Sequence, residues 1–378
     1  MRHFLERLEQ VFRNYFTYPF LRLFLRNKPF EGTIDVDSIR SVLILRYDKI
    51  GDMIVTKPIL RALKRRHPNL IIGVVTSPVN AEIIANDDWV DHRYVLKSNP
   101  VYLAKELLRA RKEKYDVVLN FVFNRTTSGA LLANFVCPNG IKIGQGNEKY
   151  AFYFNKLVSL PPFDRHMVEI LAFYVSRAFR VTFAEDELKL FYRVDAKSIE
   201  RVNKFLDEHS LNRRHHALRA NRYIVVNISV RDAMNVLTDE QLFALVTSLS
   251  RIPQFTTIII YAPEDAAKAM SVWETAGRTH CLIYPEQGTA SLAEIASLLE
   301  GAFCAVTPDT AVVHLASAMR TPVLGFFCLA HAPLWRPYGV DHQMVIAESE
   351  QRVSSIASTR MVEGAKSFLS VLQEKEKQ

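Results

Sequence analysis

Glycine is scarce in this sequence, and several familiar functional motifs are missing from it. Only 13 of the 378 residues are glycine, which argues against glycine-rich architectures. The Walker A pattern, the G-x-G-x-x-G dinucleotide fingerprint and the H-E-x-x-H zinc motif do not occur. Function therefore has to be sought in other patterns of charged and polar residues.

Cysteine is also sparse, and its spacing offers no framework for a metal site. The four cysteines are scattered, without a C-x-x-C pair, at Cys137, Cys281, Cys304 and Cys328. No signal-peptide pattern precedes them. This usage is typical of a reduced, cytosolic chain without a zinc ribbon, so we expect a cytoplasmic protein.

The overall composition is that of a folded protein with a basic surplus. Apolar residues make up 49% and charged residues 23% of the chain, and no stretch resembles a disordered tail. The length suffices for two domains with ordinary cores. A net charge of +8 and a pI of about 9.2 admit nucleic acid, anionic lipid or phosphorylated ligands as partners.

Part of the basic surplus lies at the N-terminus. Residues 1–30 carry six basic and two acidic side chains, interleaved with aromatic and aliphatic residues at helical spacing. Arginines interrupt this stretch too often for a spanning helix, which needs about 20 mostly apolar residues. We interpret residues 1–35 as an amphipathic segment that either lies in an anionic membrane interface or packs as a helix on its own protein.

Strands and helices alternate through the rest of the chain in two series. The first series, within residues 36–180, has predicted strands at 41–46, 70–76, 92–96 and 116–121 and predicted helices at 52–66, 100–114, 126–136 and 166–179. The second, within residues 223–350, has strands at 223–229, 256–262, 281–286, 304–307 and 322–327 and helices at 238–250, 263–276, 291–300 and 310–319. These arrays predict an α/β protein with two doubly wound, Rossmann-like parallel-sheet domains facing a central cleft.

Two segments stand outside this alternation. Residues 181–222 are predicted to connect the domains and end in a basic stretch, 212–222, that lacks aromatic residues. Because single-stranded nucleic acid is bound through aromatic stacking as well as charge, we expect no nucleic-acid partner. Residues 351–378 contain a last predicted helix, 352–374, which we expect to fold back over the first domain.

The first candidate site follows the first predicted strand. The segment "RYDKIGD" places Arg46, Asp48, Lys49 and Asp52 around Gly51, where a strand ends and a helix begins. Ligands of doubly wound sheets bind at the carboxyl ends of the strands. A carboxylate at a helix N-terminus is also a common cap or dipole partner, so Asp52 by itself has two interpretations.

The second candidate site follows strand 304–307. In "TPDTAVVH" the strand ends at Pro308, Asp309 is predicted to be the N-cap, and Thr310, Ala311 and Val312 begin the next helix. The free N–H groups of such a first turn, together with the helix dipole, bind anions. His314, one turn further, either faces the cleft or packs inside the domain with a hydrogen bond to the backbone.

With both segments in view, the sequence resembles the ADP-heptose:lipopolysaccharide heptosyltransferase family. "RYDKIGDMIVTKPILRAL" and "TPDTAVVHLASAMRTPVLGFF" are similar to the two hallmark blocks of that family, and "LWRPYG" is similar to a family loop. The resemblance extends from about residue 40 over nearly the whole chain. It implies an inverting glycosyltransferase of the GT-B fold that acts on the cytoplasmic face of the inner membrane of Gram-negative bacteria.

The resemblance also implies roles for the residues of the first segment. The aspartate after the glycine, here Asp52, would be the general base that takes the proton of the acceptor hydroxyl. Gly51 would allow the backbone to pass close beneath the substrate. Arg46, Asp48 and Lys49 would belong to the acceptor or phosphate site, although Arg46 and Lys49 are equally consistent with plain surface charges.

On the donor side, the D-T segment of the family matches Asp309 and Thr310. Asp309 would hold sugar hydroxyls, and the N–H groups of residues 310–312 would take the diphosphate, so that no metal or other cofactor is needed. We assign to the same site the remaining members of this set, which are Asn227, Ser229, Arg231, Ala311, Val312 and His314.

Two departures from the family pattern concern the donor. Alanine at position 311 replaces a common glycine, and it is small enough for the first helical turn. Relatives also carry a lysine or arginine about eight residues after the asparagine, often followed by tryptophan, and that cation binds donor phosphate. Here Asn235 and Leu237 stand in those places, and Arg231 is the nearby cation able to substitute.

The resemblance implies a transferase that moves heptose from ADP-heptose to the inner core of lipopolysaccharide. The expected partners are this donor, the lipopolysaccharide acceptor and, through residues 1–30, an anionic inner-membrane surface. One alternative is the same chemistry with another sugar nucleotide or glycan acceptor. Another is a non-catalytic relative that binds membrane or polysaccharide.

Overall fold

The computed structural model describes residues 18–25, 27–123, 126–146, 148–213, 221–277, 280–348 and 352–377. Most of the N-terminal segment predicted to face a membrane, and residues 214–220 of the predicted connection, therefore lie outside the described residues. The chain divides into two compact units. The first contains Met1–Lys49, Ile59–Pro162 and Glu169–Glu187, and the second contains Ile50–Pro58, Phe163–Val168 and Leu188–Gln378.

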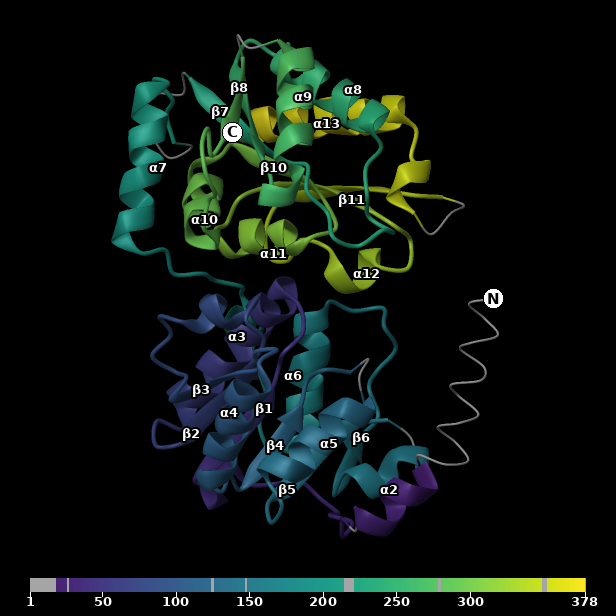
Figure 1. Cartoon of the computed structure of the whole chain (residues 1–378). Helices are drawn as coiled ribbons and strands as arrows, with labels where there is room; N and C mark the ends of the chain where they lie inside the picture. Colours follow the sequence, from purple (N-terminus) through teal and green to yellow (C-terminus); the bar gives the residue numbers. More distant parts are fainter. Residues whose placement is uncertain are drawn as a thin grey trace. The chain divides into compact units, whose positions relative to one another are not determined.

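The sheet of the first unit has six parallel strands in the order β3-β2-β1-β4-β5-β6 (Figure 1). Its central strands are short runs of Val, Ile and Leu that are buried on both faces, as expected for a parallel sheet covered by helices. The strands are β1 Ser41–Leu45, β2 Ile71–Thr76, β3 His92–Val95, β4 Val117–Asn120, β5 Ile141–Gln145 and β6 Lys156–Val158.

The start of helix α4 is marked by a local sequence signal. The helix follows Asn99, whose side chain accepts hydrogen bonds from the backbone N–H groups of Val101 and Tyr102. The α-helices of this part of the chain are α2 Tyr18–Phe24, α3 Ile50–Arg66, α4 Pro100–Lys112, α5 Thr126–Val136 and α6 Met167–Ala178. The first half of α3 is grouped with the second unit, although the helix is continuous.

The second unit repeats the same topology. Its sheet has six parallel strands in the order β12-β11-β10-β7-β8-β9, which are β7 Arg222–Asn227, β8 Phe255–Ile260, β9 Cys281–Tyr284, β10 Cys304–Pro308, β11 Val323–Phe327 and β12 His342–Ile346. Its α-helices are α7 Ala196–Glu208, α8 Asp239–Ser250, α9 Ala266–Ala276, α10 Leu292–Gly301, α11 Ala311–Ala318, α12 Ala332–Trp335 and α13 Ser358–Lys375. The predicted pair of doubly wound parallel sheets is confirmed.

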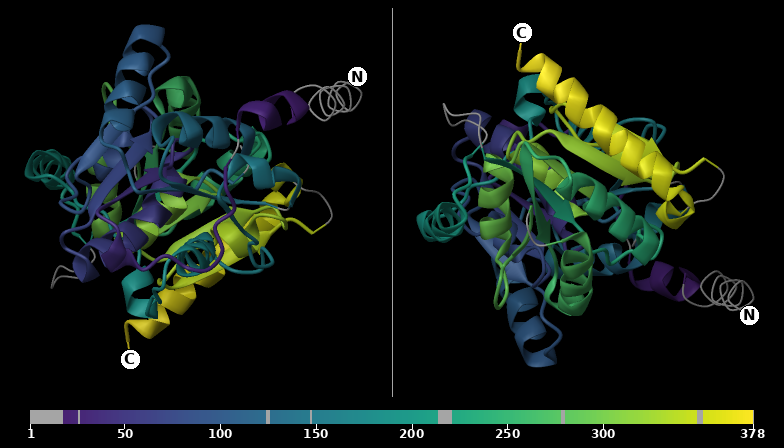
Figure 2. Two further views of the ribbon diagram at one scale, coloured as in Figure 1. Left: turned by 90° about the horizontal axis from the view of Figure 1, so that it is seen from below. Right: turned by 90° about the horizontal axis from the view of Figure 1, so that it is seen from above.

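The last helix, α13, packs on the core of the second unit. Met361, Ala365, Phe368, Leu369 and Leu372 on one face of α13 join the core of the second unit. The helix, which is the yellow ribbon in Figure 2, packs against α8 and β12. The apolar face of α13 is therefore buried within the second unit, and the expectation that the helix folds back over the first domain stays a prediction.

The predicted connection 181–222 also contains structure that the sequence reading missed. Asp195 caps α7 through a hydrogen bond from the backbone N–H of Ser198, and α7 packs against α10.

Among the described residues, no helix combines the length and apolar character needed to cross a bilayer.

In both sheets the strand order reverses next to the first strand of the unit. This switch point lies between β1 and β4 in the first sheet and between β7 and β10 in the second. Helices leave toward opposite faces of the sheet there, so a crevice opens at the carboxyl ends of the two strands and commonly holds the ligand. The two segments singled out in the sequence start at these points, since Arg46 follows β1 and Asp309 follows β10.

Candidate active site

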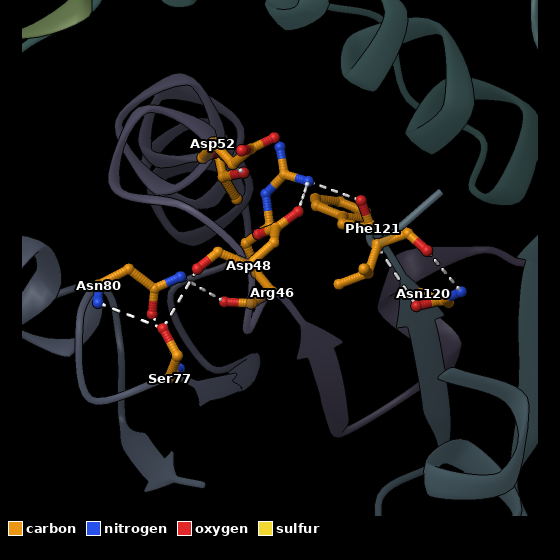
Figure 3. Close-up of polar contacts among 9 residues, drawn as sticks. Arg46, Asp48, Asp52, Ser77, Asn80, Asn120 and Phe121 are labelled. Atoms are coloured by element: carbon orange, nitrogen blue, oxygen red, sulfur yellow. Dashed lines mark hydrogen bonds and ion pairs between the residues drawn. The ribbon is translucent and has the colours of Figure 1, made fainter. Parts of the chain in front are cut away.

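Arg46 is buried at the switch point of the first sheet. Only 2% of the residue is exposed, and its Nη1 donates to the carbonyl oxygen of Phe121 at 2.6 Å and to Oδ2 of Asp48 at 3.1 Å (Figure 3). Phe121 directly follows β4, so this guanidinium joins the ends of the two strands at the reversal. The interpretation of Arg46 as a surface charge is wrong, because a buried charge needs the carboxylate and carbonyl partners that it has here.

The loop after β2 fixes the backbone around Arg46 and Asp48. Asn80 donates from Nδ2 to the carbonyl oxygen of Arg46 at 2.9 Å and accepts the backbone N–H of Ser77 at its Oδ1. The Ser77 hydroxyl donates to the carbonyl oxygen of Asp48 at 3.2 Å (Figure 3). Sequence reasoning missed Ser77 and Asn80, and their position just after a neighbouring strand was the available signal.

Asp52 lies in the first turn of α3 and is partly exposed. The N-cap position belongs to the exposed Lys49, whose side chain makes no capping hydrogen bond. Asp52 is therefore not the N-cap, although its place in the first turn still favours it as a dipole partner. The carbonyl oxygen of Asp52 accepts a hydrogen bond from the hydroxyl of Thr56 at 2.8 Å.

Gly51 and His314 approach each other closely within the second unit. A Cβ atom added to Gly51 would lie 2.8 Å from Cδ2 of His314, closer than real Cβ contacts allow. The absence of a side chain at position 51 therefore permits this approach, which is a steric role for the glycine.

At the switch point of the second sheet, a buried amide ties β7 to β10. Nδ2 of Asn227 lies 3.1 Å from the hydroxyl oxygens of both Thr307 and Thr310 and 3.2 Å from the carbonyl oxygen of Ser229. The Ser229 hydroxyl accepts the backbone N–H of Ala262 at 2.7 Å. Asn227 and Ser229 thus organise the loops of the predicted donor site through contacts within the protein.

The start of α11 differs by one residue from the prediction. Thr310, not Asp309, is the N-cap, and its hydroxyl accepts the backbone N–H of Val312 at 3.3 Å. The extended backbone of Thr310 explains the shift, because an N-cap residue lies outside helical geometry. Ala311 is the first helical residue and is partly exposed. Because the N–H group of Val312 already donates to the Thr310 hydroxyl, it contributes less to the predicted anion site.

Asp309 is held by two side chains from other loops. Asn235, with 2% of the residue exposed, donates from Nδ2 to the carbonyl oxygen of Asp309 at 2.9 Å and to its Oδ2 at 3.1 Å. Nδ1 of His331, just before α12, lies 2.9 Å from the same Oδ2. Position 235, where the family resemblance predicts a cation, thus holds an amide that contacts Asp309. Sequence reasoning missed His331.

His314 is buried in α11, where its ring contacts other rings. The ring centroid of Trp335 lies 5.6 Å from that of His314, and the centroid of His166 lies 5.9 Å away. Burial lowers the pKa of His314 below its ordinary value, so the neutral ring is favoured. Its Nδ1 is buried and makes no hydrogen bond to the part of the chain that the structure describes.

Arg231 remains on the surface of the loop after β7. Its side chain is 74% exposed, and its Nε lies 3.7 Å from Oε1 of Glu264. An exposed pair at this distance holds the guanidinium weakly, so it can turn toward an anion.

Among the residues that the structure describes, no cluster of three His, Cys, Asp or Glu side chains has the arrangement of a metal site.

The sequence is similar to known proteins over most of its length. The family model described as "Glycosyltransferase family 9 (heptosyltransferase)" matches residues 103–364. Lipopolysaccharide heptosyltransferase 3 of Escherichia coli K12 is 22% identical over 315 residues, which cover 76% of this chain and 82% of that protein. The similarity to this relative therefore extends over most of both sequences.

Solved structures resemble this fold over nearly their whole length. A glycosyl transferase family 9 protein from Veillonella parvula superposes with a TM-score of 0.71 at 16% identity, covering 90% of this chain and 99% of the other. The E. coli heptosyltransferase WaaC, solved with ADP, superposes with a TM-score of 0.63 at 18% identity, covering 88% and 99%. A second WaaC structure, with ADP-2-deoxy-2-fluoro heptose, has a TM-score of 0.61 at 18% identity and covers 87% and 99%. The two doubly wound sheets are those of the GT-B fold.

Proposed function

This chain belongs to glycosyltransferase family 9, the heptosyltransferases, and from that membership we propose that it transfers heptose from ADP-heptose to the inner core of lipopolysaccharide with Asp52 as general base. The observation that carries the proposal is the position of Asp52. It lies in the first turn of α3, after a strand end whose backbone is fixed by Arg46, Asn80 and Ser77. A base must be held in place before it can take a proton efficiently.

The proposed step is a single displacement with inversion. The acceptor hydroxyl oxygen forms a bond to the anomeric carbon of heptose, while the bond between that carbon and the diphosphate oxygen breaks on the opposite face. The hydroxyl proton passes to the carboxylate of Asp52, and ADP leaves with the electron pair. The N-terminus of α11 then offsets part of the charge that develops on the diphosphate.

Donor binding is proposed for the loops around α11. The WaaC structures with ADP and with a fluorinated ADP-heptose support a nucleotide-sugar donor for this family member. Asp309 follows β10 at the switch point and is partly exposed, which supports a role for its carboxylate as acceptor of hydrogen bonds from sugar hydroxyls. Arg231 is the cation that we assign to the diphosphate.

A different donor is the second candidate, because Asn235 stands where the family resemblance predicts a phosphate-binding cation. The two candidates are separated by offering the purified protein ADP-, UDP- and GDP-linked sugars and measuring transfer and nucleotide release. Selective use of ADP-heptose supports the first candidate, and selective use of another sugar nucleotide supports the second. The sugar missing from the lipopolysaccharide of a deletion strain would then identify the acceptor position.

We also propose that the protein works on the cytoplasmic face of the inner membrane and contacts anionic lipid through its N-terminal segment. Tyr18 and Leu21 on one face of α2 pack on the core of the first unit. Phe20, Leu23 and Phe24 are 60%, 66% and 68% exposed. Aromatic side chains beside basic residues suit an anionic membrane interface.

The membrane proposal is tested by flotation with lipid vesicles. The triple variant Phe20→Ser, Leu23→Ser, Phe24→Ser should lose binding to vesicles that contain anionic phospholipid, and wild-type binding should weaken with salt. Val101→Ser with Leu108→Ser on α4 is a matched control, since both side chains are exposed and apolar. Equal flotation of the triple variant and the wild type would contradict the proposal.

A further inference from the structure

Two side chains, from separate loops of the second unit, converge on one oxygen atom of Asp309. The amide of Asn235 lies 3.1 Å from Oδ2, and Nδ1 of His331 lies 2.9 Å from the same atom. Asn235 also reaches the backbone carbonyl oxygen of Asp309. No hydrogen bond to Oδ1 of Asp309 occurs among the described residues. The two carboxylate oxygens are therefore not equivalent.

The chemistry of the three groups fixes the direction of these hydrogen bonds. An ionised carboxylate only accepts, so Asn235 presents its NH₂ group and His331 carries a proton on Nδ1. Hydrogen bonds to a charged acceptor are stronger than neutral ones, and here two of them meet at one oxygen. Asn235 is buried, whereas 33% of the His331 side chain is exposed, so His331 lies at the edge of the site.

From this arrangement we propose that His331 and Asn235 are positioning residues for the donor sugar. They hold Oδ2 of Asp309 so that Oδ1 points to the hydroxyl groups of the sugar on the nucleotide. This inference rests on the proposed function, since it takes Asp309 as the sugar-binding carboxylate. It gives position 235 a role other than phosphate binding, and it adds His331 to the site.

The inference predicts a difference between the sugar nucleotide and the bare nucleotide. A loosely held carboxylate must be ordered again when the sugar binds, which weakens binding of the sugar nucleotide but leaves binding of the nucleotide alone unchanged. His331→Asn is the informative conservative variant. Its Nδ2 is bonded to Cγ like Nδ1 of histidine, so it can donate to the same oxygen.

The test is calorimetry with ADP-heptose and with ADP on the full chain. We expect His331→Ala to weaken ADP-heptose binding about tenfold or more, the scale of a hydrogen bond to a charged group, with ADP affinity unchanged. His331→Asn should retain the wild-type affinity for both ligands. In steady-state assays the donor KM of His331→Ala should rise more than its kcat falls. His67→Ala is the matched control, since Nδ1 of His67 lies 2.6 Å from a carboxylate oxygen of Asp37 in the first unit.

Three results would overturn the inference. They are wild-type sugar-nucleotide affinity in His331→Ala, equal loss for ADP and ADP-heptose, or an affinity of His331→Asn as weak as that of His331→Ala. If His331→Ala does not fold, His331→Gln replaces it, because its amide is one bond further from the backbone. If the wild type binds another sugar nucleotide instead of ADP-heptose, the same comparison uses that ligand. In that case the proposed donor fails, but the positioning role is still tested.

Discussion

The amide of Asn235 contacts Asp309 twice, with Nδ2 2.9 Å from its carbonyl oxygen and 3.1 Å from its Oδ2. The two residues are distant in the sequence and come from the loops after β7 and β10. Asn235, which departs from the expected family pattern, thus holds Asp309, which matches it.

Asn235→Asp should damage donor binding more than its small change in size suggests. It removes the donating NH₂ group and brings a second carboxylate next to Asp309, so like charges meet at hydrogen-bond distance. We expect the affinity for the sugar nucleotide to fall about tenfold or more, as measured by calorimetry. Asn203→Asp on the exposed face of α7 makes the same charge change and should bind normally.

Gly51→Ala should destabilise the protein through a clash with His314. A Cβ at position 51 would lie 2.8 Å from Cδ2 of a buried ring. Overpacking costs about 1–3 kcal/mol, whereas replacing glycine by alanine within a helix gains at most about 1 kcal/mol. We therefore expect a net loss in the free energy of unfolding, measured in urea.

The double variant Gly51→Ala, His314→Ala tests the cause of that loss. If the clash is responsible, the second substitution removes the opposing ring, and the two changes cost less together than their sum. Strictly additive costs would show that the two residues do not contact each other.

Arg231→Ala should weaken donor binding or turnover by about 1.5–3 kcal/mol if Arg231 holds the diphosphate. A helix N-terminus offsets only about half a charge, so a diphosphate needs a cation as well. Arg251→Ala, an exposed arginine at the end of α8, is the control. Asn235→Lys, which adds a cation and keeps an N–H donor for Oδ2 of Asp309, should partly rescue Arg231→Ala. Wild-type behaviour of Arg231→Ala would place the phosphate cation elsewhere, with Lys49 next to be tested.

Stability should fall when the pH is lowered below neutrality, because histidines are buried in the second unit. Burial lowers the pKa of His166 and of His314, and the neighbouring His314 ring lowers the pKa of His166 further. The unfolded chain then binds more protons than the folded one near the ordinary histidine pKa of about 6.5. The contribution is present above that pH and is lost as the pH falls through the lowered folded-state pKa.

His166→Asn tests this pH dependence. Asparagine keeps an acceptor for the backbone N–H of Val168, which Nδ1 of His166 now accepts at 3.2 Å, but it does not titrate. Its thermal unfolding midpoint should change less between pH 7 and pH 5 than that of the wild type. His280→Asn, at an exposed position just before β9, should behave like the wild type. Identical slopes for His166→Asn and the wild type would contradict the prediction.

The sequence was most informative where apolar residues form continuous runs. Strands such as Ser41–Leu45 are buried on both faces and could be read directly. Strand β5 was missed because Lys142 interrupts its apolar pattern. The structure buries this lysine, and its Nζ donates to the carbonyl oxygens of Cys137 and Pro138. A pattern of hydrophobic residues does not reveal that a cation is buried with backbone carbonyl partners.

The candidate site was predicted as residues but not as contacts. Asp52, Asp309 and Thr310 follow predicted strands, so their places at the carboxyl ends of the sheets could be anticipated. The contacts of Asp309 with Asn235 and His331 join three loops, and no local pattern encodes such long-range pairing. The signal for α7 was present, because Asp195 precedes an amphipathic stretch, and it was overlooked.

Transfer of heptose from ADP-heptose to lipopolysaccharide by Asp52→Asn, measured beside ADP binding in the same preparation, tests the central claim most directly. Asparagine preserves the shape of the side chain but accepts no proton, so turnover should fall about 10²- to 10⁴-fold while ADP affinity stays near that of the wild type. If the variant keeps more than about a tenth of wild-type turnover at saturating substrates, Asp52 is not the general base. It is then only a carboxylate that interacts favourably with the dipole of α3.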